Sequence, residues 1–449
     1  MVKKALLAII LGFFLWNSAY GAEKFDFSGR FFARGAIDLK HDKAIEDQRL
    51  DHEKLRLEAR FSPSYSLDIK TGVLLDRLAY YGNKNTREET RVEPWETYLR
   101  YVGRAFELTI GNQIIRWGKV DELTILDNLT RQDMRELFTL RLEERQRPWP
   151  WLRLQYFQDS FTLEGVFTLW PLWPERDDFD SDWAVFDHLR KELARDPIFQ
   201  ALNLKLKKDE PPVGLKNAEW GLRLSGTNKG VDWEVSYLYA HDRSFYYYVE
   251  DYPVKGLWLE HPAEPLKDLR AQLPSLNITG DTIYVSYPRD SIFGFAFETT
   301  FHDMGVRGEV AYHTSRVFLK KNLEAVKKPY LQWVIGIDYR FESGLYLNLQ
   351  FLQQRILGWS EDILFDPKLD SYIFVRLSKS FLQDFLEIRL DGTYGITTRG
   401  YFLNPEIAYK ITDDFEIFAG LHLIDGPQGT FFDVFDHNDQ VYLGLELNF

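Results

Sequence analysis

Apolar and polar side chains alternate with a period of two residues through most of this chain, and this pattern narrowly limits how it can fold. In residues 440–449, for example, Val441, Leu443, Leu445 and Leu447 take every second position. Successive side chains of a β-strand point to opposite faces, so such a segment predicts a strand with one apolar and one polar face. The same alternation recurs at residues 55–61, 386–394 and 415–423.

The length of these segments separates two kinds of β-protein. They span about 9–12 residues, the length of a strand that crosses a bilayer at a tilt, whereas strands of soluble sandwiches average about five or six. Aromatic residues make up 16% of the chain, which fits aromatic girdles at both membrane interfaces. We therefore predict an all-β fold, a transmembrane antiparallel β-barrel with apolar residues towards lipid and charged residues towards the lumen. A soluble, ligand-binding β-sandwich is the alternative.

The connections between the predicted strands give the strand number. Short turns, such as residues 103–104, alternate with longer polar segments, as expected when the two rims of a barrel face different compartments. This alternation of short and long connections requires an even number of strands. It predicts about 18 strands, with 16 as the alternative, in a single barrel domain at residues 22–449. Residues 170–216 and 242–290 are then long extracellular loops. Residues Asp281–Tyr287 also alternate, but an even strand number places them in a loop.

The N-terminal residues have the three regions of a secretory signal peptide. Lys3 and Lys4 precede an unbroken apolar run at residues 5–16, and a small-x-small cleavage site follows at 19–21. The apolar run is too short for a transmembrane helix. We expect residues 1–21 to be cleaved during export and the barrel to insert into the outer membrane of a Gram-negative bacterium.

The composition excludes several classes of function. The chain has no cysteine, which rules out disulfides, thiolate metal sites and cysteine nucleophiles. Its formal net charge is −13 without a basic block, so nucleic acid is not expected as a partner. The nine histidines are scattered, and none lies in an H-E-x-x-H or G-x-S-x-G context. We therefore predict no enzyme activity, no metal and no cofactor, and we interpret the acidic run at 177–182 as a solvated loop rather than a calcium site.

The last strand carries a mark of outer-membrane assembly. Phe449 ends an alternating segment that also has Tyr442 seven positions earlier. This arrangement resembles the assembly signal of bacterial outer-membrane barrels. The expected partners are therefore outer-membrane lipid and the barrel-assembly machinery, which would recognise the strand that ends in Phe449.

One long connection, residues 114–148, is the candidate constriction or plug loop. Apolar residues at 121–138 have irregular helical spacing, which predicts two or three turns of helix. Such a short helical segment would lie at the outer rim or fold into the lumen. Its candidate constriction residues are Asp121, Asp127, Asp133 and Arg135.

Two stretches of the sequence resemble a known family. Residues 111–138 have the pattern G-x-Q-x-x-x-W-G, an acidic residue, and then D-x-L-x-x-x-D-x-R-E-x-F. Residues 287–309 have Y-P-x-D, then G-x-x-F-x-T, then G-x-x-G-E. Both are similar to porin-like outer-membrane proteins of unassigned function and, more distantly, to alginate-export-type barrels. The resemblance implies a passive or partner-assisted channel, in some members beside exporters of hydrophobic compounds, and hence an envelope transport partner.

Arginines on the predicted lumen face bear on which solute passes. Glutamates share this face in comparable number, and buried guanidinium and carboxylate groups must pair, so the first interpretation is a structural network. The sharper hypothesis is that unpaired arginines near a constriction select anions. The best candidates for a row of such arginines lie on two neighbouring strands, at Arg30, Arg34, Arg56 and Arg60. We call this row the arginine ladder. The full set of candidate pore-lining residues is Arg30, Arg34, Arg56, Arg60, Arg100, Arg116, Arg153 and Arg223.

These observations together predict a porin-like outer-membrane channel. It would pass small or anionic solutes or hydrophobic compounds by diffusion through a lumen that residues 114–148 narrow. The alternative is a barrel with a closed lumen that acts as a receptor, an adhesin or a partner of an envelope lipid or hydrophobe transport system.

Overall fold

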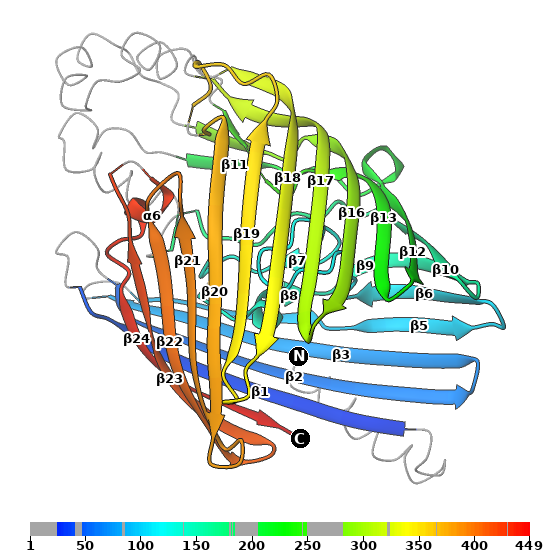
Figure 1. Ribbon diagram of the computed structural model, residues 1–449, viewed down its shortest axis with the longest axis horizontal. Helices are drawn as coiled ribbons and strands as arrows, with labels where there is room; N and C mark the ends of the chain where they lie inside the picture. Colours follow the sequence, from blue (N-terminus) through cyan, green and yellow to red (C-terminus); the bar gives the residue numbers. More distant parts are fainter. Residues whose placement is uncertain are drawn as a thin grey trace.

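The computed structural model shows a closed antiparallel β-barrel (Figure 1). It describes residues 25–40, 47–82, 86–137, 139–178, 181, 183–184, 205–244, 246–248, 282–320, 324–364, 366–428 and 430–449. The barrel strands are β1 (Phe25–Asp38), β2 (Asp47–Ser64), β3 (Leu67–Gly82), β4 (Thr86–Pro94), β5 (Thr97–Val102), β6 (Phe106–Gln113), β9 (Trp149–Phe157), β10 (Phe161–Thr168), β12 (Glu219–Asn228), β13 (Val231–His241), β16 (Arg289–Phe301), β17 (Met304–Leu319), β18 (Ala325–Arg340), β19 (Tyr346–Ile356), β20 (Leu369–Phe381), β21 (Leu386–Gly395), β22 (Tyr401–Thr412), β23 (Phe415–Asp425) and β24 (Gln440–Asn448).

β4 and β5 are two parts of one barrel strand, because both pair with β3. Val73 lies opposite Pro94, and Lys70 lies opposite Tyr98. Between the two parts, the backbone N–H of Trp95 donates to a β3 carbonyl at 2.9 Å, so the pairing continues across the interruption. With β4 and β5 counted together the barrel has 18 strands, and the pairing of β1 with β24 closes it. The predicted all-β fold and strand number are confirmed.

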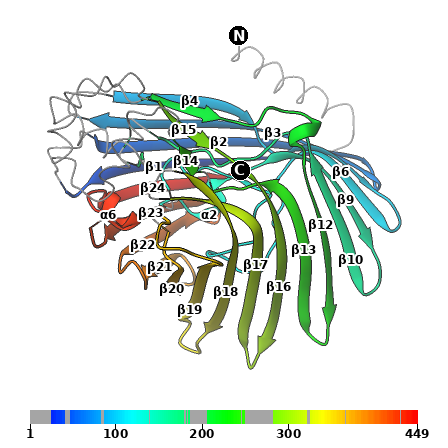
Figure 2. The same ribbon diagram turned by 90° about the horizontal axis from the view of Figure 1, so that it is seen from above.

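The two rims differ as the parity of the connections predicts. β2–β3, β9–β10, β12–β13 and β16–β17 are joined by short turns at one rim (Figure 2). The long connections, including residues 114–148, leave from the other rim. The described chain also begins and ends at the short-turn rim, where Gly29 and Phe449 exchange backbone hydrogen bonds of 2.7 and 3.0 Å.

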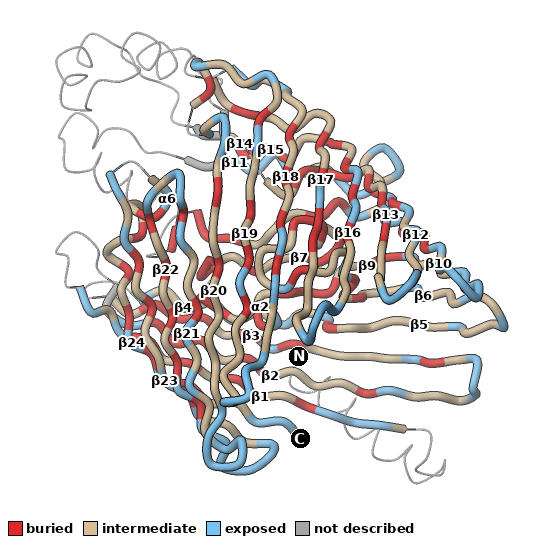
Figure 3. Tube along the Cα trace, in the orientation of Figure 1, coloured by how far each residue is buried: buried red, intermediate tan, exposed pale blue. Residues whose placement is uncertain are grey.

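Each strand has two faces with different surroundings. On β16, the side chains of Phe293 and Phe295 point outward and are 51% and 43% exposed, whereas the flanking residues Ile292 and Ala296 are 5% and 0% exposed. Figure 3 shows buried and less buried residues alternating along many of the strands. Large exposed apolar side chains are a feature of the outer face of the strands, as a lipid-facing surface requires.

The remaining elements are not part of the barrel wall. Residues 282–286 were expected in a loop, and they are indeed no part of the wall, but they form β15 (Thr282–Ser286) of a small second sheet. The other elements are β7 (Arg131–Gln132), α2 (Leu142–Arg145), β8 (Gln146–Arg147), β11 (Lys205–Asp209), η3 (Leu215–Asn217), β14 (Tyr246–Tyr248) and α6 (Phe431–Val434). Within the described residues, no helix is long and apolar enough to cross a membrane.

Some of the predicted segments lie partly or wholly outside the described residues. The expected signal peptide, residues 1–21, is one of them. Most of the expected extracellular loop at 242–290 and about half of the one at 170–216 are others. These assignments stay predictions.

Candidate functional site

Residues 114–148 fold back from the long-connection rim into the lumen. They leave the wall after β6 and rejoin it at β9, and β7, α2 and β8 form on the way (Figures 1 and 2). The helix predicted at 121–138 is wrong, because the described part of this stretch has turns and the short strand β7 instead. Among the described residues of the loop, the only helical turn is α2, in which four residues are helical. We call residues 114–148 the lumen loop.

A single carboxylate explains why the first half of the lumen loop is not helical. Oε1 of Glu309, on β17, accepts the backbone N–H groups of Lys119 and Val120, both at 2.7 Å. Oε2 accepts those of Ile125 and Leu126, at 2.8 and 3.2 Å. These N–H groups therefore bond to the wall and not to carbonyl groups four residues earlier, as a helix requires. Glu309 is 1% exposed, so the bonds are shielded from water.

Two further wall residues extend this anchor. The N–H of Gly118 donates to Oε1 of Glu234 at 2.6 Å, and that of Leu123 donates to Oε1 of Gln350 at 2.8 Å. Gly118 has a φ of +102°, and a Cβ atom there would clash with the carboxylate of Glu309. Only glycine combines this backbone conformation with so close an approach.

Trp117 joins the lumen loop to a cluster of wall charges. Its Nε1–H donates to Oε1 of Glu164 at 2.7 Å. The other oxygen of Glu164 accepts from Arg153 at 2.6 Å and from Arg223 at 3.1 Å. Two of the candidate pore-lining arginines thus meet at one carboxylate behind the loop.

The lumen face is apolar where the loop packs against it. Ile115, Leu126 and other loop residues form one buried cluster with wall residues that include Ile292, Ala296 and Ala311. The sequence predicts a charged lumen face, and this stretch of the wall departs from that expectation. The reason is that the loop, and not water, covers it.

The second half of the lumen loop is held by side-chain ion pairs. Asp76, on β3, accepts from Arg135 at 2.9 Å and from Arg147 at 2.6 Å. Asp133 accepts from the same two arginines, at 2.8 and 2.7 Å. Burial opposes ionisation of Asp133, but Arg135 and Arg147 outweigh it and hold the pKa of that carboxyl well below its usual range. The two candidate constriction residues Asp133 and Arg135 therefore belong to a buried network.

The same network extends to two arginines of the predicted ladder. Arg34 and His52 both contact the carboxylate of Glu136, a loop residue. Arg30 forms ion pairs with Glu144 of the loop at 2.8 Å and with Glu446 of β24 at 2.7 Å. This part of the ladder faces the loop and is neutralised by it.

Three further predicted arginines also lie beside carboxylates. Arg56 pairs with Glu58 at 3.0 Å. Arg60 and Arg100 both pair with Asp68, at 2.8 and 2.6 Å. All four arginines of the ladder therefore have a carboxylate partner, as a structural network requires, and the selection of anions by them stays a prediction.

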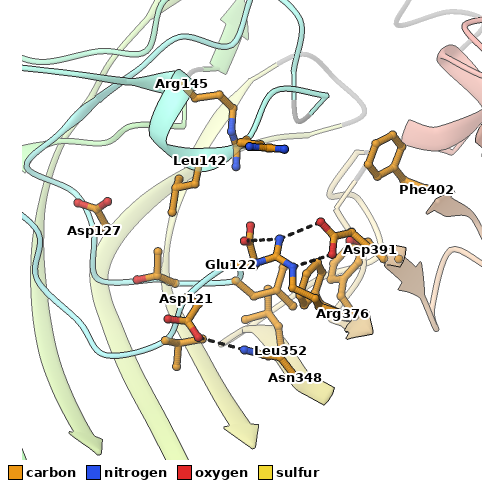
Figure 4. A pocket seen from close by; sticks show the side chains of 18 of the residues that line it. Asp121, Glu122, Asp127, Leu142, Arg145, Asn348, Leu352, Arg376, Asp391 and Phe402 are labelled. Atoms are coloured by element: carbon orange, nitrogen blue, oxygen red, sulfur yellow. Dashed lines mark hydrogen bonds and ion pairs between the residues drawn. The ribbon is translucent and has the colours of Figure 1, made fainter. Parts of the chain in front are cut away.

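A cavity of about 930 Å³ remains between the lumen loop and strands β17–β22. Ion pairs cross its surface (Figure 4). Arg376, on β20, pairs with Glu122 of the loop at 2.9 Å and with Asp391 of β21 at 2.7 Å. Asp121 accepts from Arg307 at 2.9 Å and, as Figure 4 shows, from Asn348 at 3.0 Å. Two wall arginines of the cavity are thus paired with carboxylates of the loop.

Three loop residues that line this cavity, Asp127, Arg116 and Arg145, take no part in these ion pairs. Burial raises the pKa of the Asp127 carboxyl to about 7, and nearby Arg116 only partly opposes this. Gln146 contacts both groups, since it accepts from Arg116 and donates to Asp127 at 3.1 Å. Arg145 lies in the same cavity, and no described residue gives its side chain an ion pair or hydrogen bond.

The structure divides the candidate residues of the lumen loop between two places. Asp121, Asp127 and Arg116 line the cavity, whereas Asp133 and Arg135 lie in the buried network. The anchoring residues Glu309, Glu136, Asp76, Arg147 and the cavity residue Arg145 were not among the candidates. Glu309 and Glu136 do lie in the two stretches that carried the family resemblance, and the first stretch binds the second through Glu309.

Comparison with known protein families gives one match. A family model described as "Protein of unknown function (DUF1302)" matches residues 19–335. This range includes the lumen loop, β17 and both stretches of the resemblance. No match was found among curated proteins.

Among solved structures, the barrel is similar to Acinetobacter baumannii OccAB1, with 8% identity, a TM-score of 0.53 and 95% and 96% of the two chains covered. It also aligns with Pseudomonas aeruginosa OccK7 (OpdD), with 10% identity, a TM-score of 0.49 and coverages of 96% and 99%. Salmonella typhi OmpF, in complex with daunomycin, aligns with 9% identity, a TM-score of 0.45 and coverages of 95% and 97%. The similarity to OccAB1 supports a shared porin-like barrel fold.

Proposed function

This chain belongs to the DUF1302 family of proteins of unknown function, and we propose that it is an outer-membrane channel narrowed by the lumen loop. Export would depend on residues 1–21, and assembly on the strand that ends in Phe449. Lipid would contact the exposed apolar side chains of the outer face. We assign it no catalytic role.

One observation carries this proposal: the cavity of about 930 Å³ that the lumen loop leaves beside β17–β22. The rest of the loop packs against the wall in two apolar clusters and several ion pairs. A solute that crosses the barrel would therefore pass on the β17–β22 side. A cavity of this size accommodates a small organic molecule, since ligand sites span about 300–1,000 Å³. Its lining combines charges with aromatic side chains, which suits small anionic or hydrophobic solutes.

The test is single-channel conductance of refolded protein in a planar bilayer, with the reversal potential measured in a salt gradient. We expect small discrete steps. Replacement of all four ladder arginines by glutamine should shift the reversal potential towards cations, because their carboxylate partners lose the compensating charge. A heat-modifiable band on a gel shows that each protein is folded. Folded protein without conductance would contradict the channel.

The number of anchors on the lumen loop favours one alternative. A loop fixed along both halves closes much of the lumen, as a receptor, an adhesin or a subunit of an envelope transport system for lipids or hydrophobes requires. Such a barrel would conduct only after the loop is released. A channel that opens when Glu309 is replaced, but is silent otherwise, would support this alternative.

A further inference from the structure

Two cationic side chains of the lumen loop lack the carboxylate partners that neighbouring cations have. Arg141, Arg307, Arg376 and Arg389 line the same cavity, and each forms an ion pair of 2.9 Å or less. Within the described parts of the chain, Arg145 has no such pair, and its Nε atom is buried without a partner. Glu122 and Asp133 attract this guanidinium group without forming an ion pair with it, so its N–H donors remain open to a carboxylate that a ligand brings.

Arg116 provides a second guanidinium group in this cavity. Its side chain contacts the amide of Gln146, the residue that follows Arg145, and forms no ion pair with a described carboxylate. Guanidinium groups bind carboxylates through paired N–H donors. The loop therefore presents two groups suited to a bound carboxylate on one side of the cavity.

Apolar side chains lie beside these groups, of which Leu142 is partly exposed. Leu142 and Arg145 are three residues apart in α2 and so share one face of that turn. Figure 4 shows both side chains directed into the cavity, with Leu352 and Phe402 on the opposite wall. Both of these wall residues are 7% exposed. A ligand with an apolar body would cover them while its charged end contacts Arg145.

Nearby carboxylates limit the charge of the ligand. Asp127 and Glu122 line the same cavity, and Glu122 is already paired with Arg376. Glu143 also lines it, but it is exposed and shares the cavity's edge with a second pocket beside Arg30. Asp127 acts on Arg116, and Glu122 and Asp133 act on Arg145, so these carboxylates already offset part of the charge of the two guanidinium groups. A ligand with one negative charge therefore fits the site better than a ligand with two, which the carboxylates would repel.

We infer that Arg145, Arg116 and Leu142 form a binding site for an organic monocarboxylate with an apolar body. The site deepens the proposed function and rests on it, because it would retain this class of solute on its way through the barrel. It differs from the predicted arginine ladder, whose members lie on the wall and are paired with carboxylates.

The test is equilibrium dialysis of sodium benzoate against the folded barrel in detergent. We expect saturable binding of benzoate, and much weaker binding of neutral benzamide and of inorganic phosphate. Arg145→Gln should weaken benzoate binding at least about tenfold, the effect of one lost charge-assisted contact. Arg145→Lys should restore part of it, since it restores the charge.

Lys119→Gln is the matched control, because Lys119 lines the same cavity and its nearest carboxylate oxygen, on Glu298, is 4.0 Å away. We expect it to change binding less than about twofold. Equal losses in both variants, or equal binding of benzamide and benzoate, would overturn the site. If Arg145→Gln does not fold, Arg116→Gln provides the same test.

Dialysis does not require conduction, so the two proposals fail separately. A conducting barrel that does not bind benzoate would overturn the site and leave the channel standing. A barrel that binds benzoate at Arg145 without conducting would support the site and contradict the channel.

Discussion

The two halves of the lumen loop are fixed to the same barrel by different chemistry. In the first half, residues 118–126, the donors are backbone N–H groups and the acceptors are wall side chains, above all Glu309. In the second half, residues 133–147, charged side chains of the loop pair with charged side chains of the wall, above all Asp76. The first anchor therefore depends on the path of the backbone, and the second depends on the identity of the side chains.

This difference predicts which changes each half tolerates. Most side chains of the first half can vary without loss of the anchor, because every non-proline residue supplies the same N–H donor. In the second half each charged residue is specific, because a buried charge that loses its partner is strongly destabilising. Replacements on the wall therefore test the first half, and replacements on either side test the second.

The largest effect is expected for Glu309→Ala. It leaves the N–H groups of Lys119, Val120, Ile125 and Leu126 without their acceptor. Each buried N–H group without an acceptor destabilises the folded state by about 1–3 kcal/mol. We expect the free energy of unfolding in urea to fall by about 4 kcal/mol or more. The released half should also widen the passage, so single-channel conductance should increase.

Glu387→Ala is the control for this change. Glu387 lies on the lumen-facing side of β21, and within the described chain it forms no hydrogen bond or ion pair with the loop. It should leave stability and conductance nearly unchanged. If Glu309→Ala behaves like this control, the first half of the loop is held mainly by its apolar packing and not by the carboxylate.

A smaller effect is expected for Asp76→Asn. The change removes one of the two carboxylates that face Arg135 and Arg147, while Asp133 still neutralises part of their charge. We expect a loss of about 3 kcal/mol in the free energy of unfolding and a smaller rise in conductance than for Glu309→Ala.

The double variant of Glu309 and Asp76 measures whether the two anchors are independent. Independent anchors predict additive losses, within about 0.5 kcal/mol. A loss well below the sum would mean that releasing one half already releases the other. The comparison between the halves would then describe their chemistry but not their energetics.

Gly118→Ala should have a third, still smaller effect. The residue has a φ of +102°, and the new Cβ would clash with Glu309. We expect a loss of about 1–2 kcal/mol in the free energy of unfolding, typical of a side chain forced into such a conformation. In the Glu309→Ala background the clash disappears, so the loss should shrink to the cost of placing alanine in this backbone conformation. An undiminished loss there would place the cause elsewhere.

The barrel wall was predictable from sequence because each strand repeats one local rule. Alternation along β16 and β24, together with the parity of the connections, is enough to give 18 strands. The path of the lumen loop was not predictable, since its acceptor Glu309 is 183–190 residues away from the N–H groups it binds. Apolar spacing at 121–138 suggested a helix, but those apolar residues pack on the lumen wall, and N–H groups of this stretch are bonded to Glu309 and Gln350.

The charged residues of the second half were partly predictable. Asp133 and Arg135 lie two residues apart in the connection that was expected to enter the lumen, and both proved to lie at one point of the loop. Their partners Asp76 and Arg147 gave no local signal, because a charge on an alternating strand is ordinary. Arg145 was equally inconspicuous, since what distinguishes it is the absence of a partner among the described residues.

The smallest effect concerns Asp127, which belongs to neither anchor. Arg116, Gln146, Thr130 and Glu309 act on its carboxyl, but burial is the largest influence and raises its pKa to about 7. The folded protein therefore holds this proton more tightly than the unfolded chain, so stability should fall as the pH rises towards and through 7. Between pH 6 and pH 8 we expect a loss of about 1 kcal/mol in the free energy of unfolding.

Asp127→Asn should remove this part of the pH dependence, because asparagine does not titrate, and should be the more stable form at pH 8. Asp121→Asn is the control, since Asp121 is exposed and paired with Arg307. Unfolding in urea at the two pH values checks both. If the wild type and Asp127→Asn lose stability equally between pH 6 and pH 8, Asp127 is ionised throughout. The gap between the two anchored halves would then carry a fixed negative charge, which would also weaken the binding of a carboxylate at Arg145.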